Sequence, residues 1–200
     1  MAERHKKKKN GGLKRDVVEV GIFVTVIGVI YMMGWHTEII GTLQRGLLAT
    51  RIIQPDINLD ESEFLKAEYN MPLITLDGER TSFRAYEGKT IFLNFWATWC
   101  PPCIAEMPNI QKLYESFKHN DEIVFVMLSL DQNHNNARAF MERKNFTLPV
   151  FFLVGRKPSV YNSTAIPTTY VISPDGYIVT EKRGMANYNT ESFKKFLLSF

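Results

Sequence analysis

The stretch "NFWATWCPPC", residues 94–103, holds both cysteines of the chain, Cys100 and Cys103. It overlaps an almost unbroken apolar run at 90–97, which is typical of a central parallel strand covered on both faces. After the first cysteine, apolar residues recur at helical spacing over residues 101–118. The sequence therefore places the cysteine pair where a buried strand ends and a helix begins.

The position of Cys100 at the start of this helix predicts a chemical role for its thiol. Unpaired backbone N–H groups and the helix dipole favour an anion there, so the reactive thiolate is expected to form readily. Pro101 and Pro102 suit the first turn, because the N–H that proline lacks would have no partner there. Cys103 lies three residues on, close enough to form a disulfide with Cys100. We expect Cys100 to attack a substrate and Cys103 to resolve the mixed disulfide.

Other uses of two cysteines fit the sequence less well. A zinc site needs about four ligands; the chain has no third cysteine, and His119 and His134 are not at ligand spacing, so no metal site is expected. Attachment of a c-type haem needs a histidine directly after the second cysteine, where this chain has Ile104. A purely structural disulfide across so short a ring would constrain the unfolded chain little.

The rest of the globular region alternates strand and helix patterns, which indicates an α/β fold. The expected elements are a hairpin at 71–83 turned at Asp77-Gly78, a strand at 122–130 that completes a crossover unit with 90–97, a helix at about 134–146, a strand at 148–154, an antiparallel hairpin at 168–183 and a last helix capped by Asn189 or Thr190. The inner face of that last helix is expected to carry Phe193, Phe196, Leu197 and Phe200.

The N-terminal segment has the pattern of a membrane anchor. Seven of the residues at 1–16 are Lys or Arg, and residues 17–35 are apolar apart from Glu19 and Thr25. A spanning helix needs about 20 apolar residues, and its basic flank faces the cytoplasm. We therefore expect a basic cytoplasmic tail at 1–16, one transmembrane helix at 17–35, and all later residues outside the cytoplasm. A cleaved signal peptide is the alternative, although the apolar run is long for one and no small-x-small cleavage site follows it.

The remaining chain divides into a linker at 36–69, partly amphipathic, and a globular domain at 70–200. Together these two parts carry 17 Lys or Arg residues and 18 Asp or Glu residues. The basic character of the protein thus belongs to its tail, and no basic stripe remains on the folded part. Nucleic-acid binding is therefore not expected.

Two motifs in the right order and spacing resemble the thioredoxin superfamily, and specifically its membrane-anchored TlpA/ResA-like branch. They are "LNFWATWCPPCIAEMP" at 93–108 and "IPTTYVISPDGYIV" at 166–179, and the resemblance covers about 70–200. It implies a thioredoxin-like fold, with a βαβ plus ββα core, an N-terminal hairpin and an extra strand-helix insertion. The anchor at 17–35 also fits this branch.

The resemblance also implies a substrate-binding surface around the cysteines. Pro167 matches the cis-proline of the family, which faces the cysteine pair and leaves the backbone of Ile166 free to pair with a substrate strand. Without the resemblance, Pro167 would equally be an ordinary proline at the start of a strand. Gly184, Met185 and Ala186 match the loop that completes the groove beside Trp99.

Asn94 stands where thioredoxin itself has a buried aspartate that accepts the proton of the resolving cysteine. An amide cannot accept that proton, and Glu106, one turn after Cys103 on the same side of the helix, is the candidate replacement. TlpA/ResA-like proteins are similar in this respect. The alternative is a solvated helix glutamate without a role.

The function that the resemblance implies is that of a thiol-disulfide oxidoreductase in the bacterial cytoplasmic membrane, with its catalytic domain on the extracytoplasmic side. It would reduce disulfides of extracytoplasmic proteins, such as apocytochrome c, and receive electrons from a membrane donor. No cofactor is expected beyond the Cys100–Cys103 disulfide. A disulfide oxidase or isomerase of the same fold, and a peptide-binding thioredoxin-like module, remain as alternatives.

Overall fold

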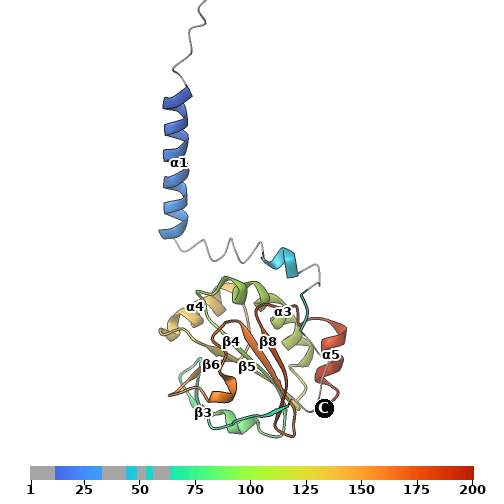
Figure 1. The fold of residues 1–200 in the computed structure, drawn as a ribbon. Coiled ribbons are helices and arrows are strands. Elements are labelled where there is room, and N and C mark those ends of the chain that lie inside the picture. The colour runs from blue at the N-terminus through green and yellow to red at the C-terminus, as the bar shows by residue number, and fades with distance from the viewer. Residues whose placement is uncertain (1–11, 33–43, 49–52, 56–63) are drawn as a thin grey trace, which may run out of the picture.

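The computed structural model describes residues 12–32, 44–48, 53–55 and 64–200, and its domain is built on one eight-stranded sheet of order β1-β8-β7-β4-β5-β6-β2-β3 (Figure 1). The strands are β1 (Leu65–Lys66), β2 (Pro72–Thr75), β3 (Arg80–Ser82), β4 (Thr90–Trp96), β5 (Ile123–Ser129), β6 (Val150–Leu153), β7 (Thr168–Ile172) and β8 (Tyr177–Arg183). The helices are α1 (Gly12–Met32), α3 (Pro101–Phe117), α4 (His134–Lys144) and α5 (Glu191–Leu197), with the 3-10 helices η2 (Phe83–Tyr86) and η3 (Ser159–Tyr161) and a short helix at 44–48. The predicted α/β fold is confirmed.

Strand β4 lies in the middle of the sheet, as its apolar run predicts. It pairs in parallel with β5 and antiparallel with β7, and every one of its residues is buried. Strand β6 extends the parallel part, and β2 adds antiparallel to β6. The turn 97–100 leads from the carboxyl end of β4 into α3, so the cysteines lie at the end of a fully buried strand.

The two faces of the sheet are covered differently. Phe92 and Trp96 of β4 belong to a buried cluster that includes residues of α3, α4 and α5. Leu93 and Phe95, which alternate with them along the strand, belong to a second cluster with residues of η2 and η3. Asn94 shares the helical face with Phe92 and Trp96, and this places its amide toward α3.

Several element ends differ from the sequence prediction by a few residues, for reasons the backbone shows. Helix α4 ends at Lys144 because Asn145 adopts a left-handed conformation with φ of 53° and donates its N–H to the last turn. Thr190, not Asn189, caps α5, accepting the N–H of Phe193. Phe200 was expected on the inner face of this helix, but α5 ends at Leu197 and the Phe200 side chain is 41% exposed.

The expected domain boundary at residue 70 falls inside the folded unit. Leu65 and Lys66 form β1, which pairs antiparallel with β8 at the edge of the sheet. Further upstream, the Asn187 side chain donates to the carbonyl of Leu48, and the Asn187 N–H donates to the carbonyl of Ile53. Leu48 is fully buried. Part of the predicted linker 36–69 therefore packs on the domain.

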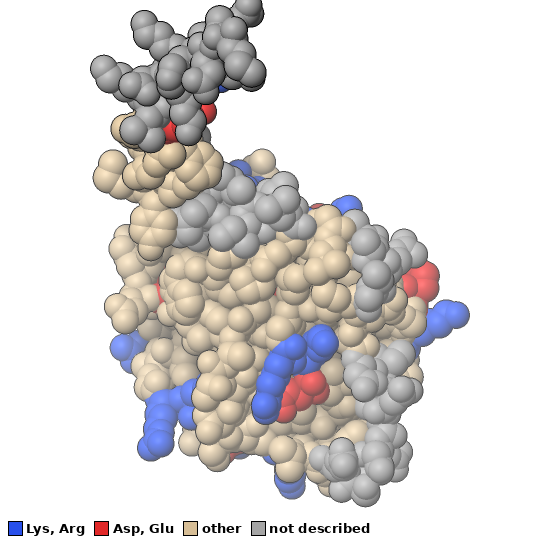
Figure 2. All heavy atoms as spheres, turned by 45° about the horizontal axis from the view of Figure 1, so that its top comes forward, with Lys and Arg blue, Asp and Glu red and all other residues tan. Residues whose placement is uncertain are grey.

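The expected anchor at 17–35 is helical from its first residue to Met32, and residues 33–35 lie outside the described part of the chain. Large apolar side chains of α1 are exposed along its length. Among the described residues, no helix has both the length and the apolar character needed to cross a membrane. On the face of the domain seen in Figure 2, the Lys and Arg side chains are scattered and do not form a stripe.

Candidate active site

Cys100 is the N-cap residue of α3, and the strand-to-helix transition places it there. Its backbone is extended, with φ of −102° and ψ of 100°, and its sulfur accepts the N–H of Cys103 at 3.2 Å. The two cysteines are joined in a disulfide, with a Cα–Cα distance of 5.3 Å. The predicted pairing is confirmed, and the structure represents the oxidised state of the pair.

The two prolines determine which backbone donor reaches the sulfur. Pro101 and Pro102 occupy the first two helical positions and lack an N–H. The N–H of Cys103 is therefore the first one that the helix start offers, and it points at Cys100. When the disulfide is reduced, this donor and the helix dipole stabilise negative charge on the Cys100 sulfur.

The two cysteines differ in how well a substrate can reach them. Cys103 is completely buried, and Cys100 retains 4% of its surface at the turn that presents Trp99, which is 59% exposed. A large exposed indole beside a nearly buried sulfur offers an apolar contact for an incoming chain. This asymmetry supports attack by Cys100 and resolution by Cys103.

The loop before β7 meets the cysteines as predicted. The Ile166–Pro167 peptide bond is cis, and the carbonyl oxygen of Ile166 lies 3.7 Å from the Cys100 sulfur. Pro167 is buried and Ile166 is half-buried. The structure thus brings Cys100, Ile166 and Pro167 into one site from segments that are 66 residues apart in the chain.

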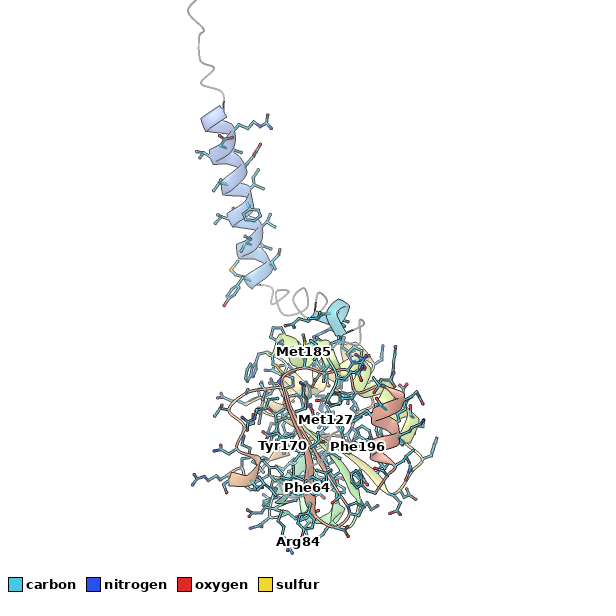
Figure 3. The ribbon with its side chains drawn as sticks, turned by 45° about the vertical axis from the view of Figure 1, so that its right-hand side comes forward. Phe64, Arg84, Met127, Tyr170, Met185 and Phe196 are labelled. Atoms are coloured by element: carbon cyan, nitrogen blue, oxygen red, sulfur yellow. A yellow bond between two sulfur atoms is a disulfide. The ribbon has the colours of Figure 1, made fainter. Side chains whose placement is uncertain are left out.

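The loop after β8 joins the same site through its backbone. Gly184 has φ of 78°, in the left-handed region that favours glycine, and its N–H donates to the carbonyl of Pro167 at 2.8 Å. Met185 follows, is half-buried, and is labelled at the upper end of the domain in Figure 3. Gly184 is therefore tied directly to the cis-proline, whereas the groove role of Met185 stays a prediction.

Glu106 is a buried carboxyl group, not a solvated one. It lies one turn after Cys103 in α3 and is fully buried. Its Oε1 accepts from Nδ2 of Asn94 at 2.9 Å, and its Oε2 accepts from the backbone N–H of Ala186 at 3.2 Å. Burial raises the pKa of Glu106 to about 8, and the two hydrogen bonds oppose that rise. A carboxyl group with such a pKa can accept and return a proton near neutral pH.

Asn94 connects this carboxyl group to the rest of the sheet. The same Nδ2 that donates to Glu106 also lies 2.9 Å from the hydroxyl oxygen of Thr169 on β7. Tyr188 is close enough that the Glu106 charge adds to burial in raising the Tyr188 pKa well above its ordinary value. The Asn94 side chain therefore positions Glu106 and takes no proton itself.

Two features of the site were missed from the sequence. Ala186 was expected only as part of the groove loop, but its backbone N–H binds Glu106, and no side-chain pattern could indicate a backbone donor. Asp131 binds Thr98 in the turn before Cys100. The sequence did contain a signal for Asp131, because this residue follows β5, which was predicted to be parallel to β4. The carboxyl ends of neighbouring parallel strands meet at one edge of the sheet, so Asp131 could have been expected near the cysteines.

The site has the donor set of a thiol redox centre. Its reactive atoms are the two sulfurs, and both carboxylate oxygens of Glu106 are engaged by N–H donors. Within the described residues, no cluster of three His, Cys, Asp or Glu side chains could hold a metal ion. This fold and this site define a redox enzyme of the thiol-disulfide oxidoreductase class.

Comparison with known proteins agrees with this class. The AhpC/TSA family model matches residues 64–181, and the chain belongs to this family as a ResA-like protein of the thioredoxin superfamily. The matched range begins at residue 64, directly before β1, which again places the start of the domain before residue 70.

Curated relatives are named for the same chemistry. The chain is 38% identical over 109 residues to thioredoxin-like protein YneN of Bacillus subtilis, a match that covers 53% of this chain and 63% of that protein. It is 32% identical over 130 residues to thiol-disulfide oxidoreductase ResA of Halalkalibacterium halodurans, covering 64% of this chain and 73% of that protein.

Solved structures share the fold. StoA from Bacillus subtilis is 27% identical, with a TM-score of 0.51, and the match covers 62% of this chain and 93% of that one. A DsbE-type thiol:disulfide interchange protein from Chlorobium tepidum has a TM-score of 0.57 at 23% identity, covering 71% of this chain and 98% of that one. The second likeness concerns the fold alone.

Proposed function

We propose that this protein reduces disulfide bonds of extracytoplasmic proteins through Cys100 and Cys103. One observation carries the proposal: the disulfide lies at the start of α3, with the carbonyl oxygen of Ile166 3.7 Å from its outer sulfur. A substrate chain that pairs with the Ile166 backbone would bring its own disulfide to Cys100. The relatives named ResA support this chemistry, and apocytochrome c is the substrate we propose from the family resemblance.

The proposed reaction passes two electrons to the substrate. The Cys100 thiolate attacks one sulfur of the substrate disulfide, forming a mixed disulfide and releasing the other substrate sulfur as a thiolate that takes up a proton. Cys103 then gives its proton to Glu106 and attacks the Cys100 sulfur. The second substrate sulfur leaves as a thiolate and takes up the proton that Glu106 received from Cys103, and the enzyme is left with the Cys100–Cys103 disulfide seen in the structure.

A reductase outside the cytoplasm needs a supply of electrons, because its surroundings are oxidising. We propose a membrane protein as the donor and a single-pass position in the bacterial cytoplasmic membrane, with the domain on the outer side. The exposed apolar side chains of α1 and the basic residues that precede it support this position. We expect the full chain to resist alkaline extraction from membranes, and we expect deletion of residues 1–35 to abolish this resistance. Release of the full chain by alkali would argue against it.

The direction of electron flow is tested by two measurements on the purified protein. With dithiothreitol as donor, the protein should accelerate insulin reduction, and equilibration with glutathione should place its potential near the reducing end of the family range, about −270 mV. A potential near about −120 mV would identify an oxidase instead. Insulin reduction at the background rate would favour a peptide-binding module.

A further inference from the structure

Asp131 is a buried carboxylate that holds the turn in front of the reactive cysteine. It follows β5, is 4% exposed, and accepts three hydrogen bonds through its two oxygens. Its Oδ2 accepts the N–H of Thr98 at 3.0 Å and the hydroxyl of Ser129 at 2.8 Å. Its Oδ1 accepts the hydroxyl of Thr98 at 2.6 Å. Thr98 is therefore bound twice by one carboxylate.

The Asp131 side chain is itself fixed in place. Ser129, which donates to Oδ2, also accepts the backbone N–H of Asp131 at 3.1 Å. Beside it, the N–H of Leu130 donates to the carbonyl of Trp96 at 2.8 Å, so the chain after β5 remains joined to the end of β4. The carboxylate is thus a rigid acceptor at the edge where the two central parallel strands end.

The turn that Asp131 binds leads directly to the redox pair. The N–H of Cys100 donates to the carbonyl of Ala97 at 3.2 Å, which closes the turn 97–100 around Thr98 and Trp99. Asp131 binds this turn at Thr98, two positions before Cys100 in the chain. Charge-assisted hydrogen bonds are about twice as strong as neutral ones, so this pair of bonds dominates the anchoring of the turn.

We infer that Asp131 is a positioning residue of the thiol-disulfide reaction, acting through Thr98. By fixing the turn, it keeps the Cys100 sulfur within reach of the Cys103 N–H and beside the Ile166 carbonyl, and it holds Trp99 outward. The inference rests on the proposed function and deepens it, because it assigns part of the reactivity of Cys100 to a carboxylate that takes no part in proton transfer. Such anchoring lowers the cost of organising the attack geometry.

The test measures alkylation of Cys100 by iodoacetamide in the reduced protein at pH 7, with the modified residue identified by peptide mapping. Thr98→Val keeps the side-chain shape but removes the hydroxyl, and we expect alkylation about tenfold slower, because one of the two hydrogen bonds that Thr98 donates to the Asp131 carboxylate is lost. Thr98→Ser keeps both bonds and should react within about twofold of the wild type. Thr147→Val is the matched control, because the Thr147 hydroxyl accepts from Gln111 away from the cysteines.

Asp131→Asn separates anchoring from charge. The amide cannot accept at both of its atoms, so anchoring predicts slower alkylation, whereas a simple effect of the negative charge on the thiolate predicts faster alkylation. Three outcomes would overturn the inference. They are alkylation of Cys100 at the wild-type rate in folded Thr98→Val and Asp131→Asn, faster alkylation in Asp131→Asn, and a rate in Thr98→Ser as slow as in Thr98→Val. Cys103 is buried in the folded protein, so a variant in which iodoacetamide also modifies Cys103 is unfolded. Such a variant is assayed again below its unfolding temperature. Insulin reduction by the wild type tests the proposed function separately.

Discussion

Replacement of Cys103 by serine should abolish catalytic turnover and leave the protein bound to its substrate. Cys100 keeps its place at the start of α3 and can still attack a disulfide. No second thiol is then within reach to break the mixed disulfide, because Cys103 is the helix residue that pairs with Cys100. Insulin reduction should fall to the uncatalysed rate, and non-reducing electrophoresis should show a stoichiometric adduct that dithiothreitol removes.

Cys100→Ser is the matched control for this experiment. It has the same number of cysteines, but its remaining thiol, Cys103, is completely buried. We expect neither turnover nor adduct from this variant. An adduct of similar yield on Cys103 would show that the order of attack is the reverse of the one proposed.

Glu106→Gln should slow the second half of the reaction and leave the first half intact. The amide keeps the shape of the side chain but cannot accept the proton of Cys103. General-base catalysis contributes about 100-fold or more, so resolution of the mixed disulfide should slow by about that factor at pH 7. Acid quenching followed by mass spectrometry should detect an accumulating mixed disulfide. Equal resolution rates in variant and wild type from about pH 5 to 9 would refute the assignment of Glu106 as the base.

The same substitution should flatten the dependence of stability on pH. Burial raises the pKa of Glu106 from the ordinary 4.5 to about 8 in the folded, oxidised protein. Because the folded pKa is above the unfolded one, the stability contributed by neutral Glu106 is complete below pH 4.5 and is lost as the pH rises through 8. Over this window Glu106 lowers the free energy of unfolding by up to about 1.4 kcal/mol per pH unit.

Denaturant unfolding of the oxidised protein at several pH values measures this slope. In Glu106→Gln the fall between pH 4.5 and 8 should be smaller than in the wild type. The slope is the informative quantity, since the amide also replaces one acceptor, facing Asn94 or Ala186, by a donor and changes the absolute stability. Identical slopes would mean that the carboxyl group ionises in the folded protein as it does in the unfolded chain.

The parts of the fold that the sequence predicted are those with long, regular patterns. Strand β4 has a seven-residue buried run, and α3 combines helical periodicity with two prolines in its first turn, so both could be located within one residue. The position of the cysteine pair was predicted from the junction between this strand and this helix. The cis form of the peptide bond before Pro167 came from the family resemblance and is confirmed.

The parts that were missed depend on contacts between distant segments. Strand β1 has only two residues, too few to show alternation, and its pairing with β8 comes from tertiary structure. The burial of Leu48 depends on its fit to a surface that the pattern of residues 36–69 does not reveal. Glu106 was identified by its spacing from Cys103, but its complete burial and its bond to Ala186 required the folded chain.

The most direct test of the account is the ionisation of Cys100 in the reduced protein. In Cys103→Ser, where Cys100 is the one remaining thiol, the ultraviolet absorbance of the thiolate can be followed as a function of pH. The account predicts half-ionisation clearly below about 8.5, the value of a free cysteine, because the helix start stabilises the anion. Half-ionisation at or above that value would contradict it.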